Sequence, residues 1–241
     1  MEKRLPILFA FTLFAWLHMS AGEIVPRDGN LQELPQIVDF ELFNGVNLSE
    51  VYTGWQEGQG YLQPQYAGGA WFNGSALHGS TTATVIFSTS GLKDEWIISP
   101  QFLATENTVV SFKAALSRFW DEPLQGNFAN NDSVSVLVST NTNQFEFVHV
   151  IHSFKLDNQP GWELERYQFD LGQFAGQLIH LAFYATNGQE ANSTVSFHLD
   201  DIEIKNAVAR DVTPLALVSP TTGQCFSDEL PVIVEIANDG F

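Results

Sequence analysis

The sequence predicts an all-β protein whose main domain is a jelly-roll β-sandwich. Many short runs of β-branched and aromatic residues follow one another, each ended by Gly, Asn, Pro or Asp. Several of these runs alternate apolar and polar residues, which is the period of a strand with one buried face. After residue 22, no segment has the periodicity of a long amphipathic helix. Many short strands without a long helix are typical of a sandwich or jelly roll.

Nine segments are expected to supply the strands of one domain, which spans residues 36–206. They cover residues 36–43, 82–89, 95–104, 108–117, 132–140, 145–154, 162–171, 177–186 and 193–204. The long polar and aromatic loop over 118–132 is of the kind that carries binding.

The first 22 residues have the three regions of a signal peptide. Lys3 and Arg4 come first, an apolar run follows over 5–17, and small residues end it at 20–22. The apolar run is short for a membrane span, although an uncleaved anchor is the alternative. We expect a secreted or outer-surface protein with no transmembrane span once the signal is removed. Residues 23–35 then form a lead-in to the domain.

The chain is strongly acidic and has a single cysteine. Its 241 residues include 28 Asp and Glu against 10 Lys and Arg, a formal net charge of -18. Such a surface argues against nucleic-acid binding, which needs a footprint of Lys and Arg, and it suits hard cations such as Ca²⁺. Because Cys225 stands alone, an exported chain has no internal disulfide and needs a large core, a bound metal ion or both.

The composition changes near residue 206. Residues 207–213 have linker character, and two strand-like runs follow in residues 214–241. About 30 residues cannot bury a sandwich core. We therefore expect residues 214–241 to be the incomplete beginning of an Ig-like domain, in a longer parent chain with further domains.

Several motifs, taken in order, resemble one known superfamily. VDFELFNG lies near the start of the predicted domain, DEWIISPQF in its middle, and WELERYQFDLGQFAGQLIHLAFY and FHLDDIEI toward its end. They resemble the MAM-like jelly-roll superfamily, and within it the bacterial cleaved-adhesin and choice-of-anchor J domains. The cysteines typical of animal MAM domains are absent, which favours the bacterial branch. The resemblance covers residues 36–205 and implies a galactose-binding-like jelly roll, which Ig-like modules often follow.

Two aspartates stand side by side in the last expected strand. Because side chains alternate between the faces of a strand, Asp200 is expected to share a face with Ile202 and Ile204, and Asp201 to lie on the other face. An unpaired carboxylate on a core face is costly. The sequence therefore raises the question of what this carboxylate binds.

The family resemblance implies an answer. In that family the first and last strands lie near each other, and their carboxylates help to bind a structural Ca²⁺. Carried over to this sequence, the resemblance implies Glu41 and Asp200 as the main ligands and Asp39 and Asp201 as helpers. Ca²⁺ takes roughly six to eight oxygens, so backbone carbonyls would complete the shell. The alternative is that these carboxylates lie in water or accept hydrogen bonds from the backbone.

No catalytic residues are expected. His149 and His152 are three positions apart on an expected strand and should face opposite sides, which does not suit one zinc ion. No G-x-S-x-G nucleophile elbow occurs. Glu163 and Glu165 are spaced to share a strand face, so a glycosidase-like enzyme with two facing carboxylates is the least favoured alternative.

Two tryptophans mark a candidate ligand surface. Trp71 and Trp120 lie in loop-like sequence beside Asn and Asp, where an exposed ring can stack on a sugar or anchor a protein contact. Arg118 and Asp121 flank Trp120 and complete the predicted ligand site. The alternative is that these rings cap the ends of the sandwich.

These features together predict a non-catalytic, secreted binding module stabilised by a structural calcium ion. Its role would be adhesion or substrate targeting, through recognition of a glycan or an extracellular protein. The runner-up is a structural spacer or accessory domain of a larger secreted enzyme, such as a protease.

Overall fold

The computed structural model describes residues 31–45, 48–69, 71–74, 79–119, 122–141, 143–208, 212–219 and 233–238. The predicted signal peptide, Cys225, Trp120 and Asp121 lie outside the described residues. Within the described part of the chain, no helix is both long enough and apolar enough to cross a membrane.

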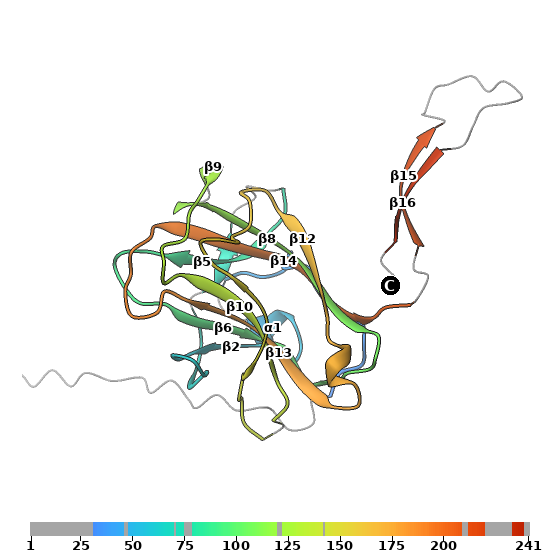
Figure 1. Ribbon diagram of the computed structural model, residues 1–241, viewed down its shortest axis with the longest axis horizontal. Coiled ribbons are helices and arrows are strands. Elements are labelled where there is room, and N and C mark those ends of the chain that lie inside the picture. Colours follow the sequence, from blue (N-terminus) through green and yellow to red (C-terminus); the bar gives the residue numbers. More distant parts are fainter. Residues whose placement is uncertain are drawn as a thin grey trace, which may run out of the picture.

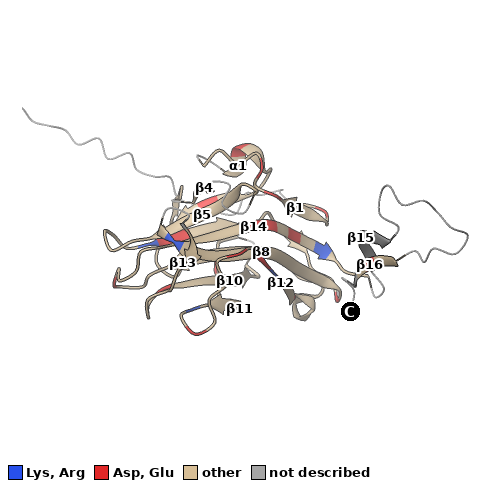
Figure 2. Ribbon diagram, turned by 90° about the horizontal axis from the view of Figure 1, so that it is seen from above, with Lys and Arg blue, Asp and Glu red and all other residues tan. Residues whose placement is uncertain are grey.

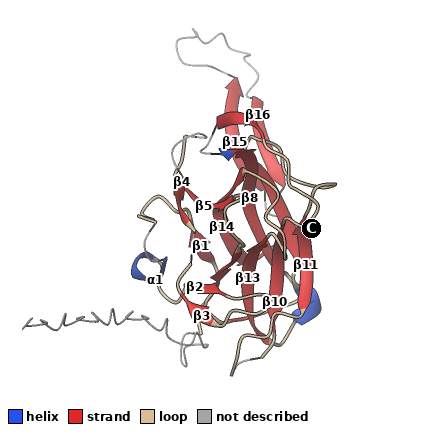
Figure 3. Ribbon diagram, turned by 90° about the vertical axis from the view of Figure 1, so that its left-hand side faces the viewer, coloured by secondary structure: helices blue, strands red, loops and turns tan. Residues whose placement is uncertain are grey.

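Two antiparallel sheets face each other and form a β-sandwich (Figures 1 and 3). The first sheet runs in the order β12 (Glu165–Asp170), β8 (Thr108–Arg118), β14 (Val195–Asn206), β5 (Thr82–Phe87), β4 (Phe72–Gly74), with β1 (Gln36–Val38) also beside β14 and β9 (Glu122–Gln125) beside β8. The second sheet runs in the order β11 (His149–Phe154), β10 (Ser133–Ser139), β13 (Leu178–Thr186), β6 (Asp94–Ile98), β2 (Gln56–Gln59), β3 (Tyr66–Ala67), with β7 (Phe102–Leu103) beside β13. The helical elements include the single turn α1 (Leu48–Val51) and the 3₁₀ turn η2 (Gly172–Phe174). The predicted all-β sandwich is confirmed.

Aromatic side chains fill the space between the sheets. Phe112 of β8 meets Phe183 of β13 edge to face, with ring centroids 5.0 Å apart. Phe154 of β11 and Phe197 of β14 are also fully buried, with centroids 5.7 Å apart. Truncating one such buried ring to alanine costs about 3–5 kcal/mol, so these contacts between sheets carry much of the stability.

The outer face of the second sheet has its own apolar cover. Trp96 of β6 stacks on Tyr184 of β13 with ring centroids 4.0 Å apart, and Phe147 packs against Trp96 from the loop before β11. The indole N–H of Trp96 donates to the carbonyl of Gly60 at 2.8 Å. This sheet is therefore buried on both faces over its central strands.

The first expected strand is shorter than predicted. Of the expected strand, only the three residues of β1 pair with β14, with Val38 opposite Ile202. The chain then turns at Phe40, whose φ of 55° lies in the left-handed region, and the Phe40 ring packs against Phe43 and Tyr52. The extended conformation predicted over 36–43 therefore ends at residue 38, because burial of the Phe40 ring pulls the chain off the sheet.

A β-bulge interrupts the last strand at its two aspartates. The pairing of β14 with β8 shifts register between Asp200 and Glu203, and Asp201 has a φ of 46°. Leu199 before the bulge and Ile202 after it both lie in the core between the sheets. The expectation that Asp200 shares the face of Ile202 and Ile204 is therefore wrong, because the bulge inserts one residue into the alternation.

Charged residues gather on the outer face of β14 after this bulge. Asp201 pairs with Lys113 at 2.7 Å, and Glu203 lies 3.8 Å from Arg166 and 3.3 Å from Lys205. Figure 2 shows the acidic residues of this strand followed by the basic one near its end.

A separate β-hairpin follows the sandwich. Strands β15 (Val212–Ser219) and β16 (Ile233–Asn238) pair with each other, and the hairpin lies apart from the two sheets in Figure 1. The identification of this segment as the start of an Ig-like domain stays a prediction.

Candidate functional site

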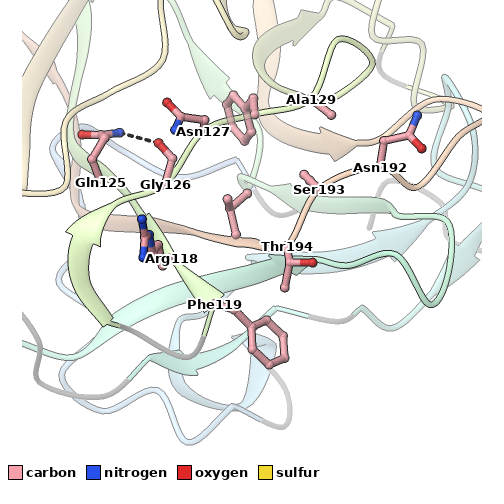
Figure 4. Close-up of a pocket in the computed structure, with 11 residues that line it drawn as sticks. Arg118, Phe119, Gln125, Gly126, Asn127, Ala129, Asn192, Ser193 and Thr194 are labelled. Carbon is pink, nitrogen blue, oxygen red and sulfur yellow. Dashed lines mark hydrogen bonds between the residues drawn. The ribbon is translucent and has the colours of Figure 1, made fainter.

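A pocket of about 510 Å³ opens at one end of the first sheet (Figure 4). The end of β8, the end of β9, the loop over 126–129 and the chain entering β14 form its walls. The lining residues are Arg118, Phe119, Gln125, Gly126, Asn127, Phe128, Ala129, Asn192, Ser193, Thr194 and Val195. The site thus joins the long loop singled out by the sequence with a segment about 65 residues farther along the chain.

Hydrogen bonds from Gln159 hold one wall of the pocket in place. Its side-chain amide donates to the Gly126 carbonyl at 3.1 Å and to Asn127 Oδ1 at 2.9 Å, and its oxygen accepts from the Phe128 N–H at 2.8 Å. Gln125 adds donations to the carbonyls of Gly126 (2.7 Å) and Pro160 (3.2 Å). The wall is therefore formed before any ligand arrives, which lowers the ordering cost of binding.

The floor of the pocket belongs to the hydrophobic core. Phe128 and Val195 are buried. The Phe128 ring lies edge to face with Phe87 at 5.3 Å and stacks on Phe197 at 6.2 Å between centroids. A floor anchored in this way does not shift when the polar side chains around it engage a ligand.

The rim of the pocket is polar and open. Arg118, Asn127, Asn192 and Thr194 are exposed, and Phe119 is half-buried. Asn192 donates through Nδ2 to a carboxylate oxygen of Glu190 at 3.0 Å, which orients its amide. An apolar floor surrounded by amide, hydroxyl and guanidinium groups suits a small molecule that has both an apolar face and several hydroxyls.

The sequence located this pocket only in part. Arg118 lines it, whereas Trp120 and Asp121 lie outside the described residues. Trp71 is elsewhere: its ring is 2% exposed and packs into the core, so the expectation that it offers an exposed ring is wrong. Sequence reasoning also missed Asn127 and Asn192; an available signal was the run of amides around Gly126 in the loop already singled out.

The second candidate site is the group of carboxylates around the bulge of β14. Asp200 is 1% exposed. Its Oδ2 accepts a hydrogen bond from the Ser80 hydroxyl at 2.6 Å, and its Oδ1 accepts from the Asp201 N–H at 2.8 Å. Burial raises the pKa of Asp200 from 3.8 to about 6, and the neighbouring charge of Asp201 adds to this rise.

Glu41 reaches the same short segment from the other end of the domain. Its Oε1 accepts a hydrogen bond from the Thr81 N–H at 3.2 Å, next to the Ser80 that binds Asp200. The pairing of β1 with β14 brings the beginning and the end of the sandwich domain together here. β14 also changes its partner here, from β5 over 195–199 to β1 over 202–204.

The two other carboxylates of the predicted metal site have partners of their own. Asp39 Oδ1 accepts from the Tyr52 hydroxyl at 2.8 Å and from the Glu41 N–H at 3.2 Å. Asp201 pairs with Lys113 at 2.7 Å. Among the described residues, no group of three or more His, Cys, Asp and Glu side chains is placed to hold a metal ion. A cation at this place would therefore need hydroxyl and carbonyl oxygens as well.

The two histidines of β11 do not form a site together. A register shift in the β10–β11 pairing sets His152 opposite Val136 and His149 opposite Val138, so both face the core side and not opposite sides as expected. Their neighbours differ, because His152 stacks on Phe169 at 4.8 Å and His149 meets Phe174 at 5.3 Å. Burial lowers the pKa of His152.

No protein-family model matches the chain, and no curated protein matches it. Among solved structures, the K1 cleaved adhesin domain of Lys-gingipain from Porphyromonas gingivalis is similar at 18% identity, covering 73% of this chain and 100% of that one, with a TM-score of 0.49. The carbohydrate-binding module TmCBM61, in complex with β-1,4-galactotriose, is similar at 10% identity over 70% of this chain and 94% of that one, with a TM-score of 0.41. The glycoside hydrolase domain of Endo-D from Streptococcus pneumoniae is similar at 13% identity over 85% of this chain and 33% of that one, with a TM-score of 0.40. These likenesses concern the fold.

Proposed function

We propose that the chain is a non-catalytic, secreted or surface-exposed binding module that recognises a glycan. The observation that carries this proposal is the pocket at the end of the first sheet, with its apolar floor and its wall fixed by Gln159. Sugars present apolar ring faces and arrays of hydroxyls, which aromatic, amide and guanidinium side chains bind together. An extracellular protein as partner is the alternative.

The lining of the pocket supports binding without turnover. General acid–base catalysis needs a titratable group such as a carboxylate or imidazole within reach of the reacting bond. The described residues that line the pocket include no Asp, Glu, His or Cys. A glycan held here would be bound and released unchanged.

A glycan array followed by calorimetry tests this function. We expect array ligands for the wild type, and no binding after Thr194→Trp, which fills the mouth of the pocket from an exposed position. Thr53→Trp, on an exposed loop residue beside a different depression, is the matched control and should leave binding unchanged. An array without ligands would reject glycan recognition and favour the structural spacer, and binding to matrix proteins alone would favour the protein partner.

The proposal includes a structural Ca²⁺ held by the carboxylates of Glu41 and Asp200. Support for such an ion comes from Asp200, a buried carboxyl with a raised pKa whose ionised form a nearby cation would favour. The Ser80 hydroxyl and backbone carbonyls would supply further oxygens. Asp39 and Asp201 would act indirectly, by shaping the chain around the two ligands.

Thermal melting with and without calcium tests the ion. We expect added Ca²⁺ to raise the Tm of the wild type, and the double variant Glu41→Ala, Asp200→Ala to lose that rise. A wild-type melting curve that is the same in EDTA and in calcium chloride would reject the proposal.

The wider setting of the module is likewise proposed. Residues 1–22 would direct export, residues 36–206 would form a MAM-like domain of the cleaved-adhesin or choice-of-anchor J kind, and residues 214–241 would begin an Ig-like domain. Amino-terminal sequencing of the exported protein tests the first point. The parent gene sequence after residue 241 tests the last.

A further inference from the structure

The pocket has an unusual charge for this chain. The protein carries 28 acidic residues and a net charge of -18, yet among the described residues that line the pocket Arg118 alone is charged. On the outer face of the same sheet, by contrast, Lys113, Arg166 and Lys205 lie beside carboxylates at 2.7–3.8 Å. Among the side chains that the structure describes, no carboxylate forms an ion pair with Arg118, whose cross-strand neighbour on β9 is Glu122.

We propose that the pocket binds a sugar that carries one carboxylate, and that Arg118 is the residue that binds this carboxylate. The inference rests on the proposed glycan recognition and names its ligand class. A planar guanidinium offers two parallel N–H donors that match the two oxygens of a carboxylate. A neutral sugar cannot form an ion pair with the Arg118 guanidinium.

The neighbours of Arg118 suit the remainder of such a sugar. In Figure 4 the guanidinium lies between the Gln125–Gly126 wall and the ring of Phe119. Asn127 uses Oδ1 to accept from Gln159 and presents Nδ2 as a donor. Asn192 uses Nδ2 to donate to Glu190, so its Oδ1 is the acceptor on the opposite side. A carboxylate at Arg118 thus leaves a donor and an acceptor for the sugar hydroxyls.

The overall charge limits the ligand to one carboxylate on an otherwise neutral glycan. A polyuronate or a heavily sulfated chain would bring many negative charges against a protein of net charge -18. Such repulsion acts over about 10 Å at ordinary salt concentrations, beyond the pocket itself. A single uronic or sialic acid avoids this repulsion and still reaches Arg118.

Calorimetry with paired probes tests the inference. The first pair of probes is 3′-sialyllactose and lactose, and the second is a xylo-oligosaccharide with and without one glucuronic acid. We expect the charged member of one pair to bind about tenfold more tightly than its neutral partner. The reason is that a hydrogen-bonded charge pair is worth about one factor of ten in affinity. The pair that shows the difference identifies the source of the carboxylate. Heparin is expected to bind no more tightly than the neutral probes.

Variants of Arg118 complete the test. Arg118→Gln should remove the tenfold preference for the charged probe over the neutral one while leaving the Tm unchanged, and Arg118→Lys should keep part of the preference. Arg166→Gln is the matched control, because it removes the same charge about 16 Å away along the sheet. Equal binding of charged and neutral probes, or a preference that survives Arg118→Gln, would overturn the inference while leaving glycan recognition standing. Binding of no probe at all, charged or neutral, would count against both.

Discussion

Replacing Asp200 by Asn is expected to stabilise the metal-free protein at pH 8. Burial raises the pKa of Asp200 from 3.8 to about 6, so between these values the folded protein holds a proton that the unfolded chain has lost. Stability therefore falls as the pH rises through this window. Above the window, the ionised carboxylate costs the folded state about 3 kcal/mol, at about 1.4 kcal/mol per pKa unit.

The gain from the substitution is smaller than this cost. The two carboxylate oxygens of Asp200 accept from the Ser80 hydroxyl and the Asp201 N–H, and Asn has one acceptor oxygen for the two donors. The lost hydrogen bond is worth about 1 kcal/mol. We therefore expect a net gain of about 2 kcal/mol at pH 8, or about 4–8 °C in Tm. At pH 4, where the wild-type carboxyl is protonated, we expect the substitution to lower the free energy of unfolding by up to about 1 kcal/mol.

Urea denaturation in EDTA at pH 4 and pH 8 measures both values. Asp201→Asn is the control, because this carboxylate is 46% exposed and paired with Lys113, and its loss should change stability by less than about 1 kcal/mol. Equal destabilisation by Asp200→Asn at both pH values would refute the burial argument. With calcium at pH 8 the wild type should be more stable than Asp200→Asn, since only the wild type keeps the carboxylate proposed to bind the ion.

Three further outcomes are expected. Gln159→Ala should weaken binding of the pocket ligand about tenfold by calorimetry and should also lower the Tm by several degrees, because the pocket wall loses its three hydrogen bonds. Glu57→Gln should stabilise the protein by about 2 kcal/mol at pH 8.5 and much less at pH 5, as measured by urea denaturation. Burial, aided by the charge of Glu95, raises the pKa of Glu57 from 4.5 to about 7, so the ionised form lowers stability above that range. Gly74→Ala should lower the Tm by several degrees in a thermal melt, because the added Cβ would collide with the Thr84 hydroxyl.

The strands that carry the core were readable in the sequence because their alternation is regular. β8 and β13 lie within the expected segments to within one residue. In β14 the alternation changes phase, with Phe197 and Leu199 at odd positions and Ile202 and Ile204 at even ones, all in one core. This change of phase is itself the signature of a bulge, and an unbroken alternation across the two aspartates gave the wrong face for Asp200.

The pocket was harder to predict because its parts come from distant loops. Arg118 ends β8, Asn127 follows β9, Gln159 holds the wall from a second connection and Asn192 lies in a third, before β14. No periodicity links such positions, since their approach is set by the way the sheets pack. The burial of Trp71 has the same origin, because a ring in loop-like sequence is covered only once the neighbouring segments fold over it.

The pairing of β1 with β14 has a consequence for the order in which the molecule folds. The partner of Val38 is Ile202, so the first strand has no place on its sheet until nearly the whole domain exists. At synthesis rates of about 5–20 residues per second, the amino-terminal segment waits roughly 10 to 30 seconds for that partner. Closing so long a loop also slows folding of the complete chain. The sandwich of such a protein therefore stays incomplete during synthesis and can close only after the last strand has been made.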